Sequence, residues 1–231
     1  KDPELAAVFG SYDTEPSAPD FLSQYRNLLH HYVHQKSRSD ASTFWSGCGA
    51  IKRDVFLEMG GFDRVKFSKP SIEDIELGYR MRRKGHRIFL DKELQVKHLK
   101  EWSFFSMLRT DVSQRAVPWS KLMLESSFSP RDLNVSTSDR VSAALVGILS
   151  VCLLIVILAA LGGGGDILYP ALILSAVLVI LLILLNRHLY GFFLEERGFG
   201  FTLLAIPMHF LYFFYSGASY GACWLKKKMS K

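Results

Sequence analysis

The sequence predicts an α/β domain followed by an α-helical transmembrane region. Segments with strand and helix patterns alternate through the first 98 residues of a chain of 231. From Val141 to Leu225 almost every charge disappears. Two stretches there have about the 20 uncharged residues that a helix needs to cross the hydrocarbon core. The chain is therefore long enough for one soluble domain and a membrane region.

The soluble part is expected to alternate between short strands and amphipathic helices. Apolar residues recur every three or four positions in the first helix. Gly60-Gly61 and Gly85 supply stop signals for the next two helices, and Ser71 can cap the third. In chain order, the expected elements are a strand at 6–12, a helix at 21–35, a strand at 43–51, helices at 53–59 and 72–84, and strands at 86–90 and 94–98.

Residues 99–140 are expected to form amphipathic or interface helices. Apolar residues recur at intervals of three or four between Trp102 and Ala116, with Arg109 and Arg115 facing elsewhere. Such a helix can lie in the membrane interface. It can equally pack on the soluble domain, and both interpretations stay open.

The membrane region is expected at 141–225, with segments at 141–161, 167–185 and 199–225 and a basic tail at 226–231. A buried core helix is the alternative for any one segment, but two long uncharged segments separated by four glycines disfavour it. Three full crossings would place the lysine tail opposite the soluble domain, against the positive-inside rule. Two crossings and a re-entrant or surface-lying third segment, bent near Pro207, would avoid this. The path of the third segment stays open.

Charge and cysteine content exclude some classes. The net charge of +6 is spread along the chain, and no nucleic-acid-binding motif is visible. Beside a membrane anchor, basic residues favour lipid headgroups or donor phosphates as partners. The three cysteines are far apart and odd in number, which supports neither a disulfide framework nor a zinc site.

Glu73 and Asp74 stand at the start of a predicted helix. The helix dipole and the exposed N–H groups favour an ionised carboxylate there. An ionised carboxylate can accept a proton from an attacking hydroxyl. An isolated Glu-Asp pair at a helix start more often caps the helix than takes part in catalysis.

Four motifs in order resemble the second half of a family 2 glycosyltransferase with the GT-A fold. This is a Rossmann-like nucleotide-diphospho-sugar transferase domain, and the apolar segments suit its membrane-anchored bacterial members. The resemblance covers about residues 6–119 and is carried by four motifs together. They are Trp45–Arg53 (WSGCGAIKR), Gly60–Asp63 (GGFD), Glu73–Arg80 (EDIELGYR) and Val96–His98 (VKH).

The resemblance implies an inverting transfer. It places the base that deprotonates the acceptor at Asp74, with Glu73 as its supporting neighbour. The Ser46–Gly49 loop would line the pocket for the donor sugar and the acceptor. The residues expected to bind substrate are Trp45, Ser46, Gly47, Cys48, Gly49, Asp63, Arg80, Arg115 and Trp119.

The resemblance also implies a divalent metal, Mg²⁺ or Mn²⁺, on the donor diphosphate. The Asp-x-Asp motif that holds this metal is absent from the sequence. The nucleotide-binding N-terminal half is therefore expected to precede Lys1 or to lie on another chain, and these residues alone are not expected to turn over. His98 is a candidate late metal ligand, although a lone histidine is more often structural. His30 and His34 have a metal-compatible spacing but no acidic partner, which favours a surface or interface helix.

Processive synthases of this family carry Gln-x-x-Arg-Trp. Here the matching stretch is Arg115–Trp119, with Pro118 in the place of arginine. We therefore expect transfer of single sugars from a nucleotide-sugar to a lipid-linked or envelope glycan acceptor. The soluble domain is expected in the cytoplasm, at a bacterial inner membrane, because the donor is cytosolic.

Two other functions are considered. A non-catalytic membrane subunit or scaffold that keeps a glycosyltransferase-like domain is the alternative. A transporter or channel is disfavoured, because the predicted segments carry no charge near their middle.

Overall fold

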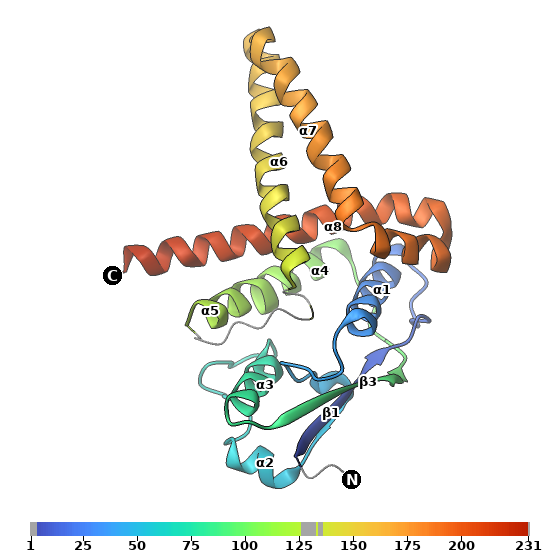
Figure 1. Ribbon diagram of the computed structural model, residues 1–231, viewed down its shortest axis with the longest axis vertical. Coiled ribbons are helices and arrows are strands. Elements are labelled where there is room, and N and C mark those ends of the chain that lie inside the picture. The colour runs from blue at the N-terminus through green and yellow to red at the C-terminus, as the bar shows by residue number, and fades with distance from the viewer. Residues whose placement is uncertain (1–3, 126–132, 134–135, 231) are drawn as a thin grey trace. The chain divides into compact units, whose positions relative to one another are not determined.

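The computed structural model describes residues 4–125, 133 and 136–230. These residues are mostly helical and include a small sheet of three strands (Figure 1). The chain divides into two compact units, one of residues 1–136 with 223–231 and the other of residues 137–222. The expected combination of strands and helices is confirmed.

The sheet has the order β2-β1-β3 and mixed direction. Strand β1 (Leu5–Tyr12) is central, antiparallel to β2 (Gly49–Ile51) and parallel to β3 (Arg87–Val96). Successive residues of β1 are buried on both faces, as is usual for a covered central strand.

Most predicted helices of the first unit are confirmed within one or two residues. Helix α1 is capped by the Asp20 side chain, which accepts a hydrogen bond from the amide of Ser23 at 3.0 Å. The predicted cap at Ser71 is wrong, because Ile72 occupies the N-cap of α3 without a side-chain bond. The elements are α1 (Phe21–Lys36), the 3₁₀ turn η1 (Ser46–Cys48), α2 (Arg53–Glu58), α3 (Glu73–Arg83), α4 (Phe104–Thr110), the π-helical turn η2 (Asp111–Ala116) and α5 (Val117–Glu125).

The predicted strand at 43–51 is wrong over its first part. Only Gly49–Ile51 pairs with β1, and Ser46–Cys48 forms a turn. The chain folds over the Trp45 side chain here, since a Cβ at Gly47 would lie 2.5 Å from the Trp45 ring. Glycine therefore allows a turn where a side chain would keep the chain extended.

The two strands predicted at 86–90 and 94–98 are one strand, β3. The register passes from Phe9–Leu90 to Ser11–Gln95, so four residues of β3 bulge opposite one residue of β1. That residue is Gly10, where a Cβ would lie 2.1 Å from the carbonyl oxygen of Leu94. The glycine makes room for a bulge that in sequence looks like a loop between strands.

The core of the first unit lies between the sheet and α3. Helix α3 approaches the chain at Thr43–Phe44 closely, because a Cβ on Gly78 would lie 2.4 Å from the amide nitrogen of Phe44. This contact fixes the start of α3 next to the Trp45–Gly49 segment. Buried members of this core include Ala6, Phe9, Phe44, Val55, Leu77, Met81, Ile88 and Leu90.

The second unit is helical. Helices α6 (Thr137–Gly162) and α7 (Gly165–Leu185) form a hairpin that turns at Gly163, whose φ is +69° (Figure 1). Helix α8 (Arg187–Met229) follows. All three helices are long and apolar enough to cross a membrane. The break in α8 lies at Gly198, with φ +80°, and Pro207 lies inside a helical stretch. The chain bends at the residue that tolerates positive φ most readily.

Candidate functional site

The Asp74 carboxylate is partly buried at the N-terminus of α3. Its Oδ2 accepts hydrogen bonds from the Ser46 amide at 2.9 Å and from the Ser46 hydroxyl at 3.0 Å. Its Oδ1 accepts one from the Ile75 amide at 2.8 Å. Burial raises the pKa of Asp74 above its usual 3.8 and the neighbouring Glu73 charge adds to this, while the Ser46 and Ile75 bonds act in the opposite direction. The result is a positioned carboxylate that accepts a proton more readily than an exposed aspartate.

Glu73 holds the turn that precedes α3. Its Oε2 accepts a hydrogen bond from the Ser71 amide at 2.6 Å. The Ser71 hydroxyl in turn donates to the carbonyl oxygen of Gln114 at 2.7 Å. Glu73 therefore fixes the backbone next to Asp74, and the Ser71 hydroxyl links this turn to η2.

Pro118 explains why the Gln114 carbonyl is available to Ser71. In an α-helix the amide of residue 118 would donate to the carbonyl of residue 114. Proline has no N–H, and η2, a wider π-helical turn, ends at Ala116, just before α5. The residue that departs from the processive motif thus leaves a carbonyl that ties η2 to the start of α3.

Trp45 begins the segment Trp45–Gly49, which we call the glycine loop. The loop carries Ser46, which holds Asp74, and packs its Trp45 ring against three other rings. These are Tyr12 at 4.8 Å, His30 at 4.9 Å and His34 at 5.3 Å between centroids. A Cβ at Gly49 would lie 2.7 Å from the carbonyl oxygen of Trp45, so the loop is folded too tightly for a side chain there. The Cys48 thiol is free and partly exposed.

Tyr12 lies at the centre of a group of rings, here named the Tyr12 aromatic cluster, formed by Tyr12, His30, His34, Trp45 and His98. The Tyr12 ring lies 4.3 Å from His98 and 4.9 Å from His30, between centroids. The group combines the end of β1, one face of α1, the glycine loop and the segment after β3. It adjoins Asp74 through Ser46.

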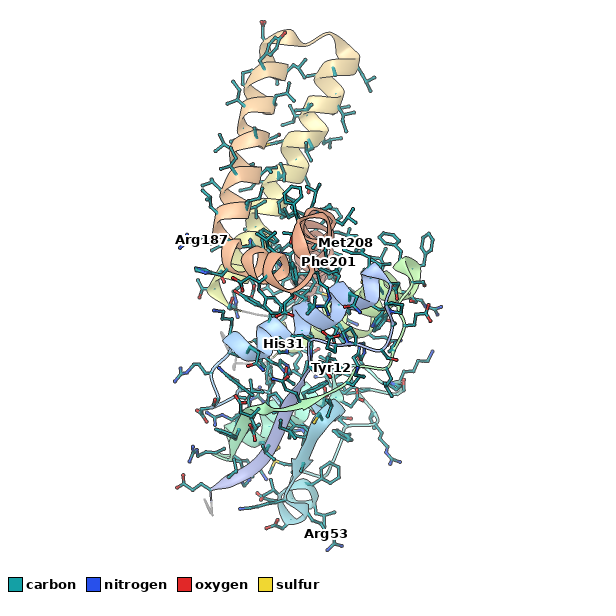
Figure 2. All side chains as sticks on the ribbon, turned by 90° about the vertical axis from the view of Figure 1, so that its right-hand side faces the viewer. Tyr12, His31, Arg53, Arg187, Phe201 and Met208 are labelled. Atoms are coloured by element: carbon teal, nitrogen blue, oxygen red, sulfur yellow. The ribbon has the colours of Figure 1, made fainter. Side chains whose placement is uncertain are left out.

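Hydrogen bonds from α1 to β1 fix one side of this cluster. His31 and Tyr12 lie close together (Figure 2), and His31 Nδ1 donates to the Tyr12 carbonyl at 2.7 Å. His34 Nδ1 donates to the Gly10 carbonyl at 3.1 Å. The Nδ1 atoms of His30 and His98 are buried and have no hydrogen-bond partner among the described residues. These two nitrogens are available to a bound molecule.

Basic residues approach the cluster from α1, η2 and the segment after β3. Burial, followed by the positive charges of Arg26, Lys100 and Arg115, lowers the pKa of His98. Burial also lowers the pKa of His30 well below its usual range, with the charge of His34 next in size. The histidines are therefore neutral at physiological pH, next to three basic residues of which Arg26 is paired with the buried Asp111 carboxylate at 2.6 Å. This combination suits a phosphate or a neutral sugar better than a cation.

The expected metal ligand His98 has no suitable companions. Among the described residues, no three histidine, cysteine, aspartate or glutamate side chains come together as a metal site. The charged groups that act on His98 are cationic. These donors do not fit Mg²⁺ or Mn²⁺, which prefer carboxylate and other oxygen ligands.

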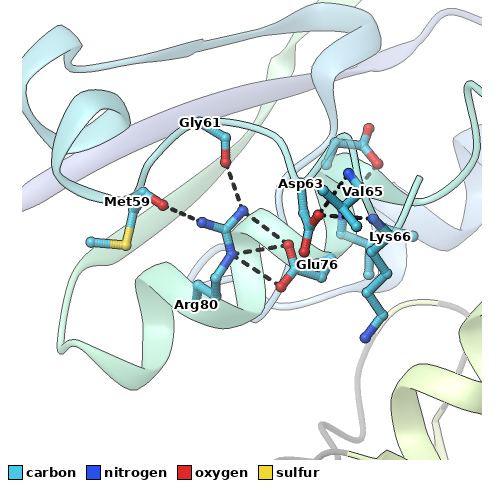
Figure 3. Close-up of polar contacts among 9 residues, drawn as sticks. Met59, Gly61, Asp63, Val65, Lys66, Glu76 and Arg80 are labelled. Atoms are coloured by element: carbon cyan, nitrogen blue, oxygen red, sulfur yellow. Dashed lines mark hydrogen bonds and ion pairs between the residues drawn. The ribbon is translucent and has the colours of Figure 1, made fainter. Parts of the chain in front are cut away.

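Arg80 and Asp63 organise the segment between α2 and α3 (Figure 3). Arg80 Nε donates to both Glu76 carboxylate oxygens at 3.0 and 2.9 Å, and its two terminal nitrogens donate to the carbonyls of Met59 and Gly61. Asp63 Oδ1 accepts from the amides of Val65 at 3.0 Å and Lys66 at 2.8 Å. Both side chains are engaged within the protein, so their role in substrate binding stays a prediction.

Trp119 packs on α3. Its Nε1 donates to the Tyr79 hydroxyl at 3.1 Å, and its ring lies against the group of Ile72, Tyr79 and Leu122. Arg115, one turn earlier, is close enough to influence the pKa of Tyr12 and of His98. Of the two residues predicted from the Arg115–Trp119 stretch, Arg115 is thus the one whose charge acts on the Tyr12 aromatic cluster.

Five residues of this region were not predicted as site residues from the sequence: Tyr12, Arg26, His30, His34 and Lys100. They lie on β1, on α1 and after β3, with no shared motif. The density of histidines between positions 30 and 34 was the one available signal.

No protein-family model, curated protein or solved structure matches this chain. The class of protein therefore rests on the chain itself. Its three apolar helices are what a membrane protein requires.

Proposed function

We propose that this chain carries the acceptor-activating part of a membrane-bound inverting glycosyltransferase. The observation that carries the proposal is the Asp74 carboxylate, partly buried and held by Ser46 of the glycine loop. A carboxylate with a raised pKa is a better general base than an exposed one, because its pKa is nearer to the working pH.

In the proposed reaction, a hydroxyl of the acceptor lies against Asp74 and gives it a proton. The hydroxyl oxygen forms a bond to the anomeric carbon of the donor sugar, and the bond from that carbon to the phosphate oxygen breaks. The nucleoside diphosphate leaves with the bonding electrons, and the anomeric configuration inverts. Ser46 orients the carboxylate throughout.

The Tyr12 aromatic cluster supports a sugar or phosphate ligand. Aromatic rings supply flat apolar faces, and Lys100 and Arg115 supply positive charge suited to phosphate oxygens, while Arg26 is paired with Asp111 at 2.6 Å. We propose that a lipid-linked or envelope glycan acceptor binds here and receives single sugars.

The proposal needs a nucleotide-binding part that this sequence does not contain, and it assigns the divalent metal to that part. It also places the first unit in the cytoplasm at a bacterial inner membrane, where nucleotide-sugars are available. This placement is supported by the proposed donor, because nucleotide-sugars are cytosolic.

The test is activity of the full-length protein in lipid nanodiscs with a panel of UDP-, GDP- and dTDP-sugars. Asp74→Asn is expected to lose about 10²–10⁴-fold in the rate of nucleoside diphosphate release, because it removes a general base. Asp91→Asn is the matched control, since an asparagine oxygen can still accept the hydrogen bonds of the Glu93 and Leu94 amides. It should retain wild-type activity.

The pH profile gives a second measurement. The wild-type rate should fall on the acid side with an inflection above 3.8, the usual aspartate pKa, because protonated Asp74 cannot act as a base. If both variants match the wild type, the proposal fails, and a non-catalytic subunit or scaffold becomes the better description.

A further inference from the structure

The two ends of α8 belong on the same side of a membrane crossed by the α6–α7 hairpin. Helix α6 begins directly after the first unit. The end of α7 lies beside the start of α6, where Asn186 Nδ2 donates a hydrogen bond to Ser142 Oγ at 3.1 Å. The last turns of α8 belong to the first unit. There Cys223 Sγ lies 4.0 Å from the Val117 carbonyl, and Lys227 Nζ donates to the Leu124 carbonyl. If α8 crossed the membrane an odd number of times, its first and last residues would lie on opposite sides of the membrane.

Helix α8 also folds back on itself at Gly198. In a straight helix, Tyr190 and His209 would be about 28 Å apart. The Tyr190 hydroxyl is instead 3.1 Å from His209 Nδ1, and the rings of Phe193 and Phe201 are 5.7 Å apart. Only the arm after Gly198 is long enough to cross a bilayer, and it is too short to cross twice.

The hairpin contacts α8 only near its base. Phe213 packs in a cluster with Leu149 of α6 and Leu182 of α7, and a Cβ on Gly217 would lie 3.6 Å from the Ala143 carbonyl. Toward the tip, Leu161 is 82% exposed and Ile173 is 66% exposed. Both views of the second unit show α8 running across the base of the hairpin (Figures 1 and 2). If α8 crossed the membrane parallel to α6 and α7, it would cover the half of the hairpin nearer the tip, where these side chains are exposed.

One face of the longer arm of α8 is apolar and exposed. At 100° per residue, Phe199, Leu203, Pro207, Phe214 and Leu225 fall within about a quarter of the helix circumference, and all five are exposed. The chain has no charged residue from Gly198 to Leu225. The other face carries buried polar residues, namely Thr202, His209 and Ser219.

Basic groups stand at both ends of α8. Arg187 begins its first arm and Lys226–Lys228 end the second, while Arg197 at the bend is paired with Glu196 at 3.6 Å. Lys228 Nζ lies 5.3 Å from the Trp224 ring centroid. Tryptophan and lysine at a helix end are typical of the boundary between lipid and water, where the ammonium group reaches the headgroup phosphates.

We infer that α8 lies in the plane of the membrane surface, on the side of the first unit, with a phospholipid headgroup layer as its partner. Only α6 and α7 then cross the membrane. The lysine tail stays on the same side as the first unit, which agrees with the positive-inside rule. This inference is independent of the proposed enzymatic function.

Cysteine labelling of the full-length protein tests this topology. The three native cysteines are replaced (Cys48→Ser, Cys152→Ala, Cys223→Ala). Single cysteines are then placed by Ser230→Cys at the end of α8, Glu93→Cys on β3 and Gly162→Cys at the hairpin tip. In sealed vesicles of known orientation, a membrane-impermeant maleimide should label positions 230 and 93 from one side and position 162 from the other. Labelling of position 230 from the same side as 162 would overturn the inference.

Depth measurement tests the in-plane orientation independently. A bimane probe is attached at Phe199→Cys, Leu203→Cys or Phe214→Cys, with Ile155→Cys in the middle of α6 as the deep control. Lipids brominated near the headgroup should quench the three α8 probes alike, while lipids brominated deep in the chain should quench position 155 most. A depth that changes steadily along α8 and reaches that of position 155 would refute an in-plane helix.

Discussion

Replacement of Arg80 by methionine should destabilise the start of α3 and the loop before it. Methionine is similar to arginine in helix propensity and keeps an unbranched apolar stem, so the substitution removes mainly charge and hydrogen bonds. The Arg80 side chain is 27% exposed and its partner Glu76 is 11% exposed. Loss of the guanidinium leaves the Glu76 carboxylate and the carbonyls of Met59 and Gly61 without this donor.

The expected loss is about 2–3 kcal/mol. A hydrogen bond to a charged group contributes about 1.5–3 kcal/mol, and a buried charge left alone adds to the loss. Because Arg80 is about a quarter exposed, water replaces part of the lost interactions. The total loss of stability therefore stays near the contribution of one hydrogen bond to a charged group. Arg82→Met is the control on the same helix. Its pair with Asp40, whose side chain is 46% exposed, should contribute about 0–1 kcal/mol.

Hydrogen–deuterium exchange of the full chain in detergent measures this difference. A loss of 2–3 kcal/mol corresponds to about 30–150-fold faster exchange of the amides in α3 and in residues 60–66. Arg82→Met should change these rates less than about fivefold. Equal effects of the two substitutions, or an Arg80 effect below threefold, would refute the structural role assigned to Arg80.

Two further predictions concern the same unit. Burial lowers the pKa of His34 from 6.5 to about 4, so the neutral form stabilises the fold above pH 6.5 and this stabilisation is lost as the pH falls toward 4. The loss of unfolding free energy should reach about 3 kcal/mol in denaturant titrations. His34→Gln should flatten the dependence of the unfolding free energy on pH in this range. If the slope is unchanged in the variant, the pH dependence does not come from His34. Gly78→Ala places a Cβ 2.4 Å from the Phe44 amide nitrogen and should cost about 1–3 kcal/mol despite the better helix propensity of alanine. Gly147→Ala, which meets open space in α6, is its control in thermal unfolding, and equal melting temperatures would argue against the close approach.

Much of the local structure could be predicted from the sequence. Strand β1 and helices α1, α2 and α3 were expected within one or two residues, because apolar spacing and glycine stops act over short distances. Apart from the cap predicted at Ser71, the errors in this unit occurred at glycines. At Gly47 the chain turns over the Trp45 ring, and at Gly10 it accommodates a bulge. In both places a contact with another part of the chain decided the conformation.

The candidate site was predictable only in part. The motifs grouped Asp74 with the glycine loop, and Ser46 does hold its carboxylate across 28 positions of sequence. Apart from the histidines between positions 30 and 34, no pattern indicated that Tyr12 and His30 would join them. The Arg80 guanidinium was expected at the substrate, and it is engaged with Glu76 and two backbone carbonyls.

The sequence by itself determined the approximate extents of the first two apolar helices, the division into a charged and an apolar part, and the position of Asp74 at a helix start. These properties depend on residues within one or two helical turns. The third apolar helix, predicted at 199–225, extends over Arg187–Met229. The tertiary structure decided which groups meet: Ser46 with Asp74, Ser71 with the Gln114 carbonyl that Pro118 leaves available, and Tyr190 with His209 across the bend at Gly198. Such pairs depend on how distant elements pack, because hydropathy gives the length of a helix but not the direction in which it runs.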